Sequence, residues 1–165
     1  MSARAQELAS LFEQTNEDFI SFITGMSESD WLTVCPNEER TVAALAFHVA
    51  GGYSFELRAF AGIANGDEQP IVTKEYLDRV NAQDGARFAH ADRAATIELL
   101  RTDGRTAAEF VRSLNDEQLK RVGAYIDWVP PMSVEKWIEL VLIGHIRMHR
   151  ASMEAVLHPE TAPQA

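Results

Sequence analysis

Two histidines four residues apart, His145 and His149, stand near the C-terminal end of the chain in the sequence GHIRMHRAS. Apolar residues recur around them at steps of three and four, so both rings are expected on the inward face of one helix. A third histidine, His48, falls on the apolar stripe of an earlier helix. Imidazoles one helical turn apart are suitably spaced to share one ion. The pattern therefore predicts a metal site formed by the three histidines.

Neutral imidazole nitrogen is a ligand for zinc, nickel, copper or iron, and zinc or nickel is the ion that we expect. Three histidines leave one coordination position open for water or substrate, which is typical of a catalytic site. A structural zinc site would more often be closed by four ligands rich in cysteine. The alternative interpretation is that each histidine is a neutral core residue, hydrogen-bonded to a neighbour.

Five further residues have side chains that could take part in chemistry. The single cysteine, Cys35, is expected to be an inert thiol, or else a thiol activated by the positive end of the helix that follows it. His90 and His158 lie near predicted helix ends and are expected to be solvated. Arg58 or Arg150 could hold a substrate carboxylate, and the alternative for each is a solvated or ion-paired surface role.

The elements that must position the histidines are helices. Runs of apolar residues at helical spacing predict five of them, with Thr41, Thr73, Asp92 and Ser133 as N-caps and Gly25 at the end of the first. No stretch alternates as a strand should between hairpin turns. The predicted helices cover residues 1–24, 41–63, 73–90, 92–114 and 133–157, and residues 115–132 are expected to form an ordered loop.

The fold class predicted from these elements is all-α, with the first, second, fourth and fifth helices forming a four-helix bundle. The third helix is an extra one in the crossover between bundle helices 2 and 3. This connection is long enough for those two bundle helices to run parallel. Residues 1–158 are expected to form a single domain, and residues 159–165 a flexible tail.

The charge of the chain limits its partners. There are 15 Lys and Arg residues against 25 Asp and Glu residues, which gives a formal net charge of -10. This is the wrong sign for binding nucleic acid or an anionic membrane surface. No apolar run reaches the roughly 18 residues that a membrane span needs, and the N-terminal segment lacks the apolar core of a signal peptide. We therefore expect a cytoplasmic protein without a membrane or nucleic-acid partner.

Four stretches give the chain a resemblance to the DinB/YfiT-like superfamily of metalloenzymes: RTVAALAFHVAGGY, YLDRVNAQDGARFAHADRAATIELL, SLNDEQL and GHIRMHRASM. The second stretch is similar to the branch that includes the metal-binding domain of mycothiol-dependent maleylpyruvate isomerase. The resemblance implies an up-down-down-up bundle and a divalent ion held by His48, His145 and His149. It also implies a homodimer. Relatives often carry glutamine where Ser152 stands.

The resemblance further implies a small-molecule substrate and a low-molecular-weight thiol, used by an S-transferase or an isomerase. Asn81, in the family-like phrase VNAQ, is expected to reach the site and contact the bound cofactor. A metal-dependent hydrolase is the second interpretation, but it needs a general base. Glu56 lies two turns beyond His48 on the same helix, which is rather far for that role, so this interpretation is weaker. The third interpretation is a stress protein that binds a metal or ligand without catalysis.

Overall fold

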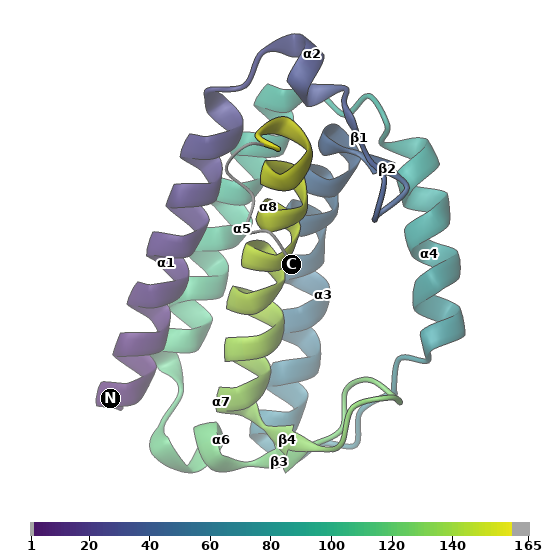
Figure 1. Ribbon diagram of the computed structural model, residues 1–165. Helices are drawn as coiled ribbons and strands as arrows, with labels where there is room; N and C mark the ends of the chain where they lie inside the picture. The colour runs from purple at the N-terminus through teal and green to yellow at the C-terminus, as the bar shows by residue number, and fades with distance from the viewer. Residues whose placement is uncertain (1, 160–165) are drawn as a thin grey trace.

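Four long helical segments form the body of the molecule in the computed structural model, which describes residues 2–159 (Figure 1). The last segment is continuous but contains a π-helical stretch, η1. The all-α prediction is confirmed. The four segments are α1 (Ala3–Thr24), α3 (Val42–Asn65), α5 (Arg93–Ser113) and the run of α7 (Val134–Trp137), η1 (Ile138–Ile143) and α8 (Gly144–Leu157).

The directions of the four segments follow from hydrogen bonds at one end of the bundle. Arg93, at the start of α5, donates to the carbonyl of Met26, just beyond the end of α1, at 2.6 Å. Thr41, the N-cap of α3, donates to the carbonyl of Ala89, shortly before α5, at 2.8 Å. The helices α3 and α5 therefore begin at the same end and run parallel, while α1 and the α7–α8 segment run the other way (Figure 1). This is the up-down-down-up order.

The crossover between α3 and α5 contains α4 (Lys74–Arg87), which stands beside α3 and apart from the other bundle helices (Figure 1). None of its residues is buried. It is attached near the start of α3, where the rings of Phe47 and Phe88 stack with centroids 3.8 Å apart. Gly85 lies against the side chain of Arg40, because an added Cβ would come within 2.9 Å of Arg40 Cγ. The helix α4 thus lies on the outside of the bundle, next to α3.

The predicted N-caps are confirmed: Thr41, Thr73, Asp92 and Ser133 each accept a hydrogen bond from a backbone amide in the first turn of their helix. Shorter elements appear where loops were expected. The short helices are α2 (Glu28–Trp31) and α6 (Asp116–Lys120), and the strand pairs are β1 (Val34–Cys35) with β2 (Arg40–Thr41), and β3 (Val122–Gly123) with β4 (Met132–Ser133).

A buried polar network joins three of the bundle helices. Tyr53 of α3 donates to Asn16 of α1 at 2.7 Å, and Asn16 donates to the carbonyl of Leu100 in α5 at 3.0 Å. Gly104 makes room for this network, since a Cβ there would come within 2.5 Å of Asn16 Nδ2. Gly104 therefore allows α1 to approach α5, although glycine is a poor helix former.

No helix within residues 2–159 is both long enough and apolar enough to cross a membrane. Of the predicted tail, residues 159–165, only Pro159 belongs to the described part of the chain. The rest of the tail lies outside it.

Candidate metal centre

The three predicted histidines meet near one end of the bundle. His48 lies in the second turn of α3, and His145 and His149 lie on successive turns of α8. Nε2 of His145 is 3.0 Å from Nε2 of His48 and 2.8 Å from Nε2 of His149. With bonds of 2.0 to 2.1 Å, two nitrogens on one tetrahedral ion lie about 3.3 Å apart. The three side chains could therefore hold a metal ion.

The π-helical stretch η1 comes directly before these histidines. The amide of Gly144 donates to the carbonyl of Glu139, five residues earlier, and an added Cβ on Gly144 would lie 3.1 Å from that oxygen. The wider turn changes which side chains face inward. The predicted stripe continued through Val141 and His145, but the structure buries Leu142 instead and leaves Val141 and His145 partly exposed. His145 is thus at the edge of the core.

Glu38 fixes the orientation of His149. Its Oε1 lies 2.9 Å from Nδ1 of His149 and 3.0 Å from the hydroxyl of Ser152, which donates to it. Arg40 contacts Oε2 of the same carboxylate at 2.9 Å. The hydrogen bond from His149 lowers the pKa of Glu38 to about 2. Ser152 therefore helps to hold the Glu38 carboxylate that orients His149. Relatives are expected to carry glutamine at the position of Ser152.

This contact also sets the tautomer of His149. Because Nδ1 carries the proton that Glu38 accepts, Nε2 presents a lone pair toward His145. Such a carboxylate–histidine pair is the usual arrangement around a metal ligand. Glu38 was not predicted as a functional residue, and it lies in the turn between β1 and β2. A turn residue shows no helical periodicity, so no sequence pattern indicated it.

Glu56 supplies a second carboxylate, and the expectation that it lies too far from the histidines is wrong. Its Oε1 is 3.5 Å from Nδ1 of His145, and only 4% of the residue is exposed. The side chain folds back along α3 over Gly52, where an added Cβ would come within 3.1 Å of Oε1. Its other oxygen, Oε2, is buried and has no hydrogen-bond partner among the described residues.

Two of the three imidazoles, those of His48 and His149, are held in their neutral form. The pKa of His48 is lowered to about 2, mainly by burial and also by the neighbouring rings of His145 and His149. Burial also lowers the pKa of His149, against the opposing effect of Glu38. Neutral rings offer lone pairs, which is the state that metal binding requires. Nitrogen lone pairs facing each other at about 3 Å need a shared proton or a cation between them, so the donor set fits a metal ion.

Asn81, the predicted cofactor contact, lies on α4 and lines a hollow of about 570 Å³. Glu38 and Arg40 line the same hollow, but none of the three histidines does. Asn81 therefore shares a hollow with the carboxylate that orients His149, and its contact with a cofactor stays a prediction.

The remaining candidates lie outside the cluster. Cys35 is buried, and burial raises the pKa of its thiol to about 11, so the inert interpretation is favoured. His90 and His158 are exposed. Arg150 pairs with Glu154 at 2.7 Å, as expected for a surface arginine.

Comparison with known families agrees with this geometry. The model of the DinB superfamily matches residues 11–153, which include all three histidines and both carboxylates. The chain shows no significant similarity to a functionally curated protein or to a solved structure. Because the family model covers most of the sequence, this chain belongs to the DinB superfamily.

Proposed function

We propose that this protein is a metal-dependent enzyme that activates a low-molecular-weight thiol, acting as an S-transferase or an isomerase. The observation that carries the proposal is the convergence of three imidazoles without a fourth protein ligand among the described residues. His48, His145 and His149 would hold the ion, with zinc or nickel as the proposed metal. A bound divalent ion would lower the pKa of a thiol or a water coordinated at the open position.

The protein's own groups supply the rest of the chemistry. Three neutral ligands leave the full charge of a divalent ion uncompensated, so an anionic fourth ligand such as a thiolate is favoured. Glu38 orients His149, and Glu56 is placed beside His145 with a free oxygen that could accept the thiol proton. Cys35 is buried and protonated at neutral pH, so the sulfur nucleophile would come from solution.

Sequence similarity to the branch of mycothiol-dependent isomerases supports a thiol as co-substrate. We include in the proposal a small-molecule electrophile as second substrate, a cytoplasmic location and a homodimer, each as implied by the resemblance. A non-catalytic protein that binds metal or ligand is the competing view, and it predicts a centre that does not exchange its fourth ligand.

A metal-dependent hydrolase is the second candidate, and one observation favours it. Glu56 is a candidate for the general base that a hydrolase needs, because its unpartnered Oε2 is buried near His145. In that reaction a water would occupy the open position and Glu56 would take its proton.

Titration of the cobalt-substituted protein with 2-mercaptoethanol or glutathione distinguishes these functions. Thiol activation predicts a new sulfur-to-cobalt charge-transfer band and a change in the visible spectrum that saturates with thiol. A cobalt spectrum that is insensitive to millimolar thiol would contradict the proposal and favour hydrolysis or binding alone. The His145→Ala variant serves as the control, since it lacks one of the three ligands.

A further inference from the structure

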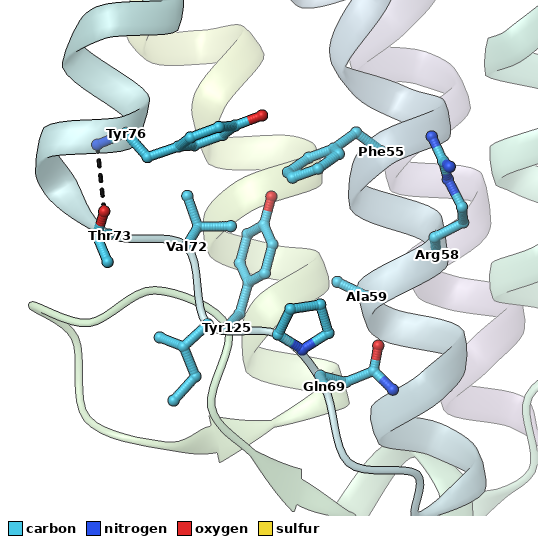
Figure 2. Close-up of a pocket in the computed structure, with 10 residues that line it drawn as sticks. Phe55, Arg58, Ala59, Gln69, Val72, Thr73, Tyr76 and Tyr125 are labelled. Carbon is cyan, nitrogen blue, oxygen red and sulfur yellow. Dashed lines mark hydrogen bonds between the residues drawn. The ribbon is translucent and has the colours of Figure 1, made fainter.

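A second feature of the molecule lies further along α3, in the space between that helix and α4. A cavity of about 490 Å³ is lined there by Phe55, Arg58 and Ala59 of α3, by residues 69–73 of the crossover, and by Tyr76 and Tyr125. Figure 2 shows the rings of Phe55, Tyr76 and Tyr125 arranged around it. The volume is within the range of about 300 to 1,000 Å³ that small-molecule sites occupy.

The apolar side chains around this cavity are unusually accessible. Phe55 is 41% exposed, Ile71 52% and Tyr76 43%, so three large hydrophobic residues border one hollow. Hydrophobic residues scattered singly on a surface are common and need no explanation. Several of them lining one hollow are instead typical of a ligand-binding site. The cavity is therefore suited to an apolar, ring-sized group.

Tyr125 adds a specific polar group to this apolar lining. Only 6% of the residue is exposed, and its ring packs edge-on against Phe60 and Trp137, with centroids 5.7 and 5.5 Å away. Its backbone carbonyl accepts a hydrogen bond from the amide of Val72 at 2.9 Å. The tyrosine is thus held rigidly by the protein.

The hydroxyl of Tyr125 points into the cavity, between the rings of Phe55 and Tyr76 (Figure 2). It makes no hydrogen bond to any of residues 2–159. Burial raises the pKa of this hydroxyl, and the charge of Glu56 raises it further, so the group is a neutral donor. A donor that faces a cavity and has no acceptor among the described residues is suited to a hydrogen bond with a ligand oxygen.

We propose that this cavity binds an aromatic ketone or aldehyde, whose carbonyl oxygen accepts a hydrogen bond from Tyr125 while its ring packs against Phe55 and Tyr76. Phe55 lines the cavity, and the next residue along α3, Glu56, contacts His145.

The claim that this cavity binds the electrophile of the reaction rests on the proposed function and gives the class of that substrate. The claim that the cavity binds a ketone rests only on the cavity and on Tyr125. The two claims are separated by an experiment that measures binding without thiol and without turnover.

Binding can be measured by ¹⁹F NMR with a matched pair of probes, 4-fluoroacetophenone and 4-fluoroethylbenzene, which differ in the carbonyl oxygen. The purified protein is expected to bind both. Tyr125→Phe should weaken binding of the ketone by about fivefold, as for the loss of one hydrogen bond, and leave the ethyl compound within twofold. Ala59→Trp, which fills the cavity, should abolish binding of both probes.

Two further variants keep the test decisive. Phe55→Ala removes one wall without overpacking the site and should weaken both probes, whereas Ala94→Trp, at an exposed position of α5, should change neither. Absence of probe binding, or binding that survives Ala59→Trp and Phe55→Ala in folded protein, would overturn the assignment of the cavity. Equal weakening of both probes by Tyr125→Phe would overturn the role of the hydroxyl. Failure of the thiol titration would overturn the proposed function and leave this assignment standing.

Discussion

The carboxylate of Glu38 accepts a hydrogen bond from Nδ1 of His149 at 2.9 Å, although the two residues are 111 positions apart in the sequence. A turn between two short strands thus reaches over the end of the bundle and orients a ligand on the last helix. The same carboxylate contacts Arg40 and Ser152, so its own position is fixed from two further sides. Metal affinity should therefore depend on a residue that does not touch the metal.

Replacing Glu38 is expected to weaken metal binding without removing a ligand. Glu38→Ala frees the His149 ring to rotate and to change tautomer, which should lower metal affinity by about 10- to 100-fold. The affinity can be measured by competition with a chromophoric chelator. Glu39→Gln, in the same turn, is the control. Equal affinities for Glu38→Ala and the parent would show that this contact does not support the centre.

The buried charge of Glu56 should destabilise the metal-free protein. Its Oε2 has no hydrogen-bond partner among residues 2–159, so Glu56→Gln, which removes the charge and keeps the shape, is expected to raise the free energy of unfolding by about 1 kcal/mol. Urea unfolding of the metal-free protein measures this difference. Glu154→Gln, which breaks only a surface pair with Arg150, should change it by less than about 0.5 kcal/mol. A lower stability for Glu56→Gln than for the parent would contradict the prediction.

The stability of the metal-free protein should fall as the pH falls below about 6.5. The pKa of His48 is about 2 in the folded protein against 6.5 as its ordinary value, so between these values only the unfolded chain binds the proton. Unfolding then takes up one proton at His48, which corresponds to about 1.4 kcal/mol of stability lost for each pH unit. The lowered pKa of His149 acts in the same direction.

Below pH 4.5 the carboxylate of Glu38 should add to this loss, because its pKa is lowered from 4.5 to about 2 and its contribution is present only above that range. Urea unfolding at half-unit steps from pH 7.5 to 4 gives the dependence. His48→Gln should make the curve shallower by about 1.4 kcal/mol per pH unit between pH 6 and 4.5. A parent protein whose stability is constant between pH 7 and 5 would rule out neutral, buried histidines.

Two glycines in helices should respond oppositely to alanine. At Gly104 the new Cβ would come within 2.5 Å of Asn16 and disturb its contacts with Tyr53 and Leu100, so Gly104→Ala should cost about 2 kcal/mol of stability. At Gly51 the nearest atom is 3.8 Å away, and Gly51→Ala should stabilise α3 by about 0.5 to 1 kcal/mol. Thermal unfolding compares the two variants, and a stabilising effect at Gly104 would refute the close approach of α1 and α5.

Much of this fold could be predicted from local sequence. N-caps such as Thr41 and Ser133 act within one turn of their own helix, and apolar periodicity follows the helix face, so both are visible without coordinates. The ligand pair His145 and His149 was predictable for the same reason, since residues four apart share a face.

The features that were missed depend on contacts between distant segments. Glu38 is brought to His149 by the β1–β2 turn, whose two-residue strands are too short to alternate. Glu56 reaches His145 because its side chain folds back over Gly52 and because His145 of α8 lies beside this part of α3. The π-helical stretch before Gly144 leaves no periodic pattern in the sequence. Val141 was therefore predicted to face inward, whereas the structure buries the next residue, Leu142.

Metal analysis of the protein purified without a histidine tag tests the central claim most directly. Elemental analysis of the parent, together with His145→Ala and His149→Ala, should find about one divalent ion per chain in the parent and a loss of that ion in both variants. Circular dichroism establishes that the variants are folded. If the parent neither retains a divalent metal nor takes one up at micromolar concentration, while the variants fold as well as the parent, the three histidines are core residues and there is no metal centre.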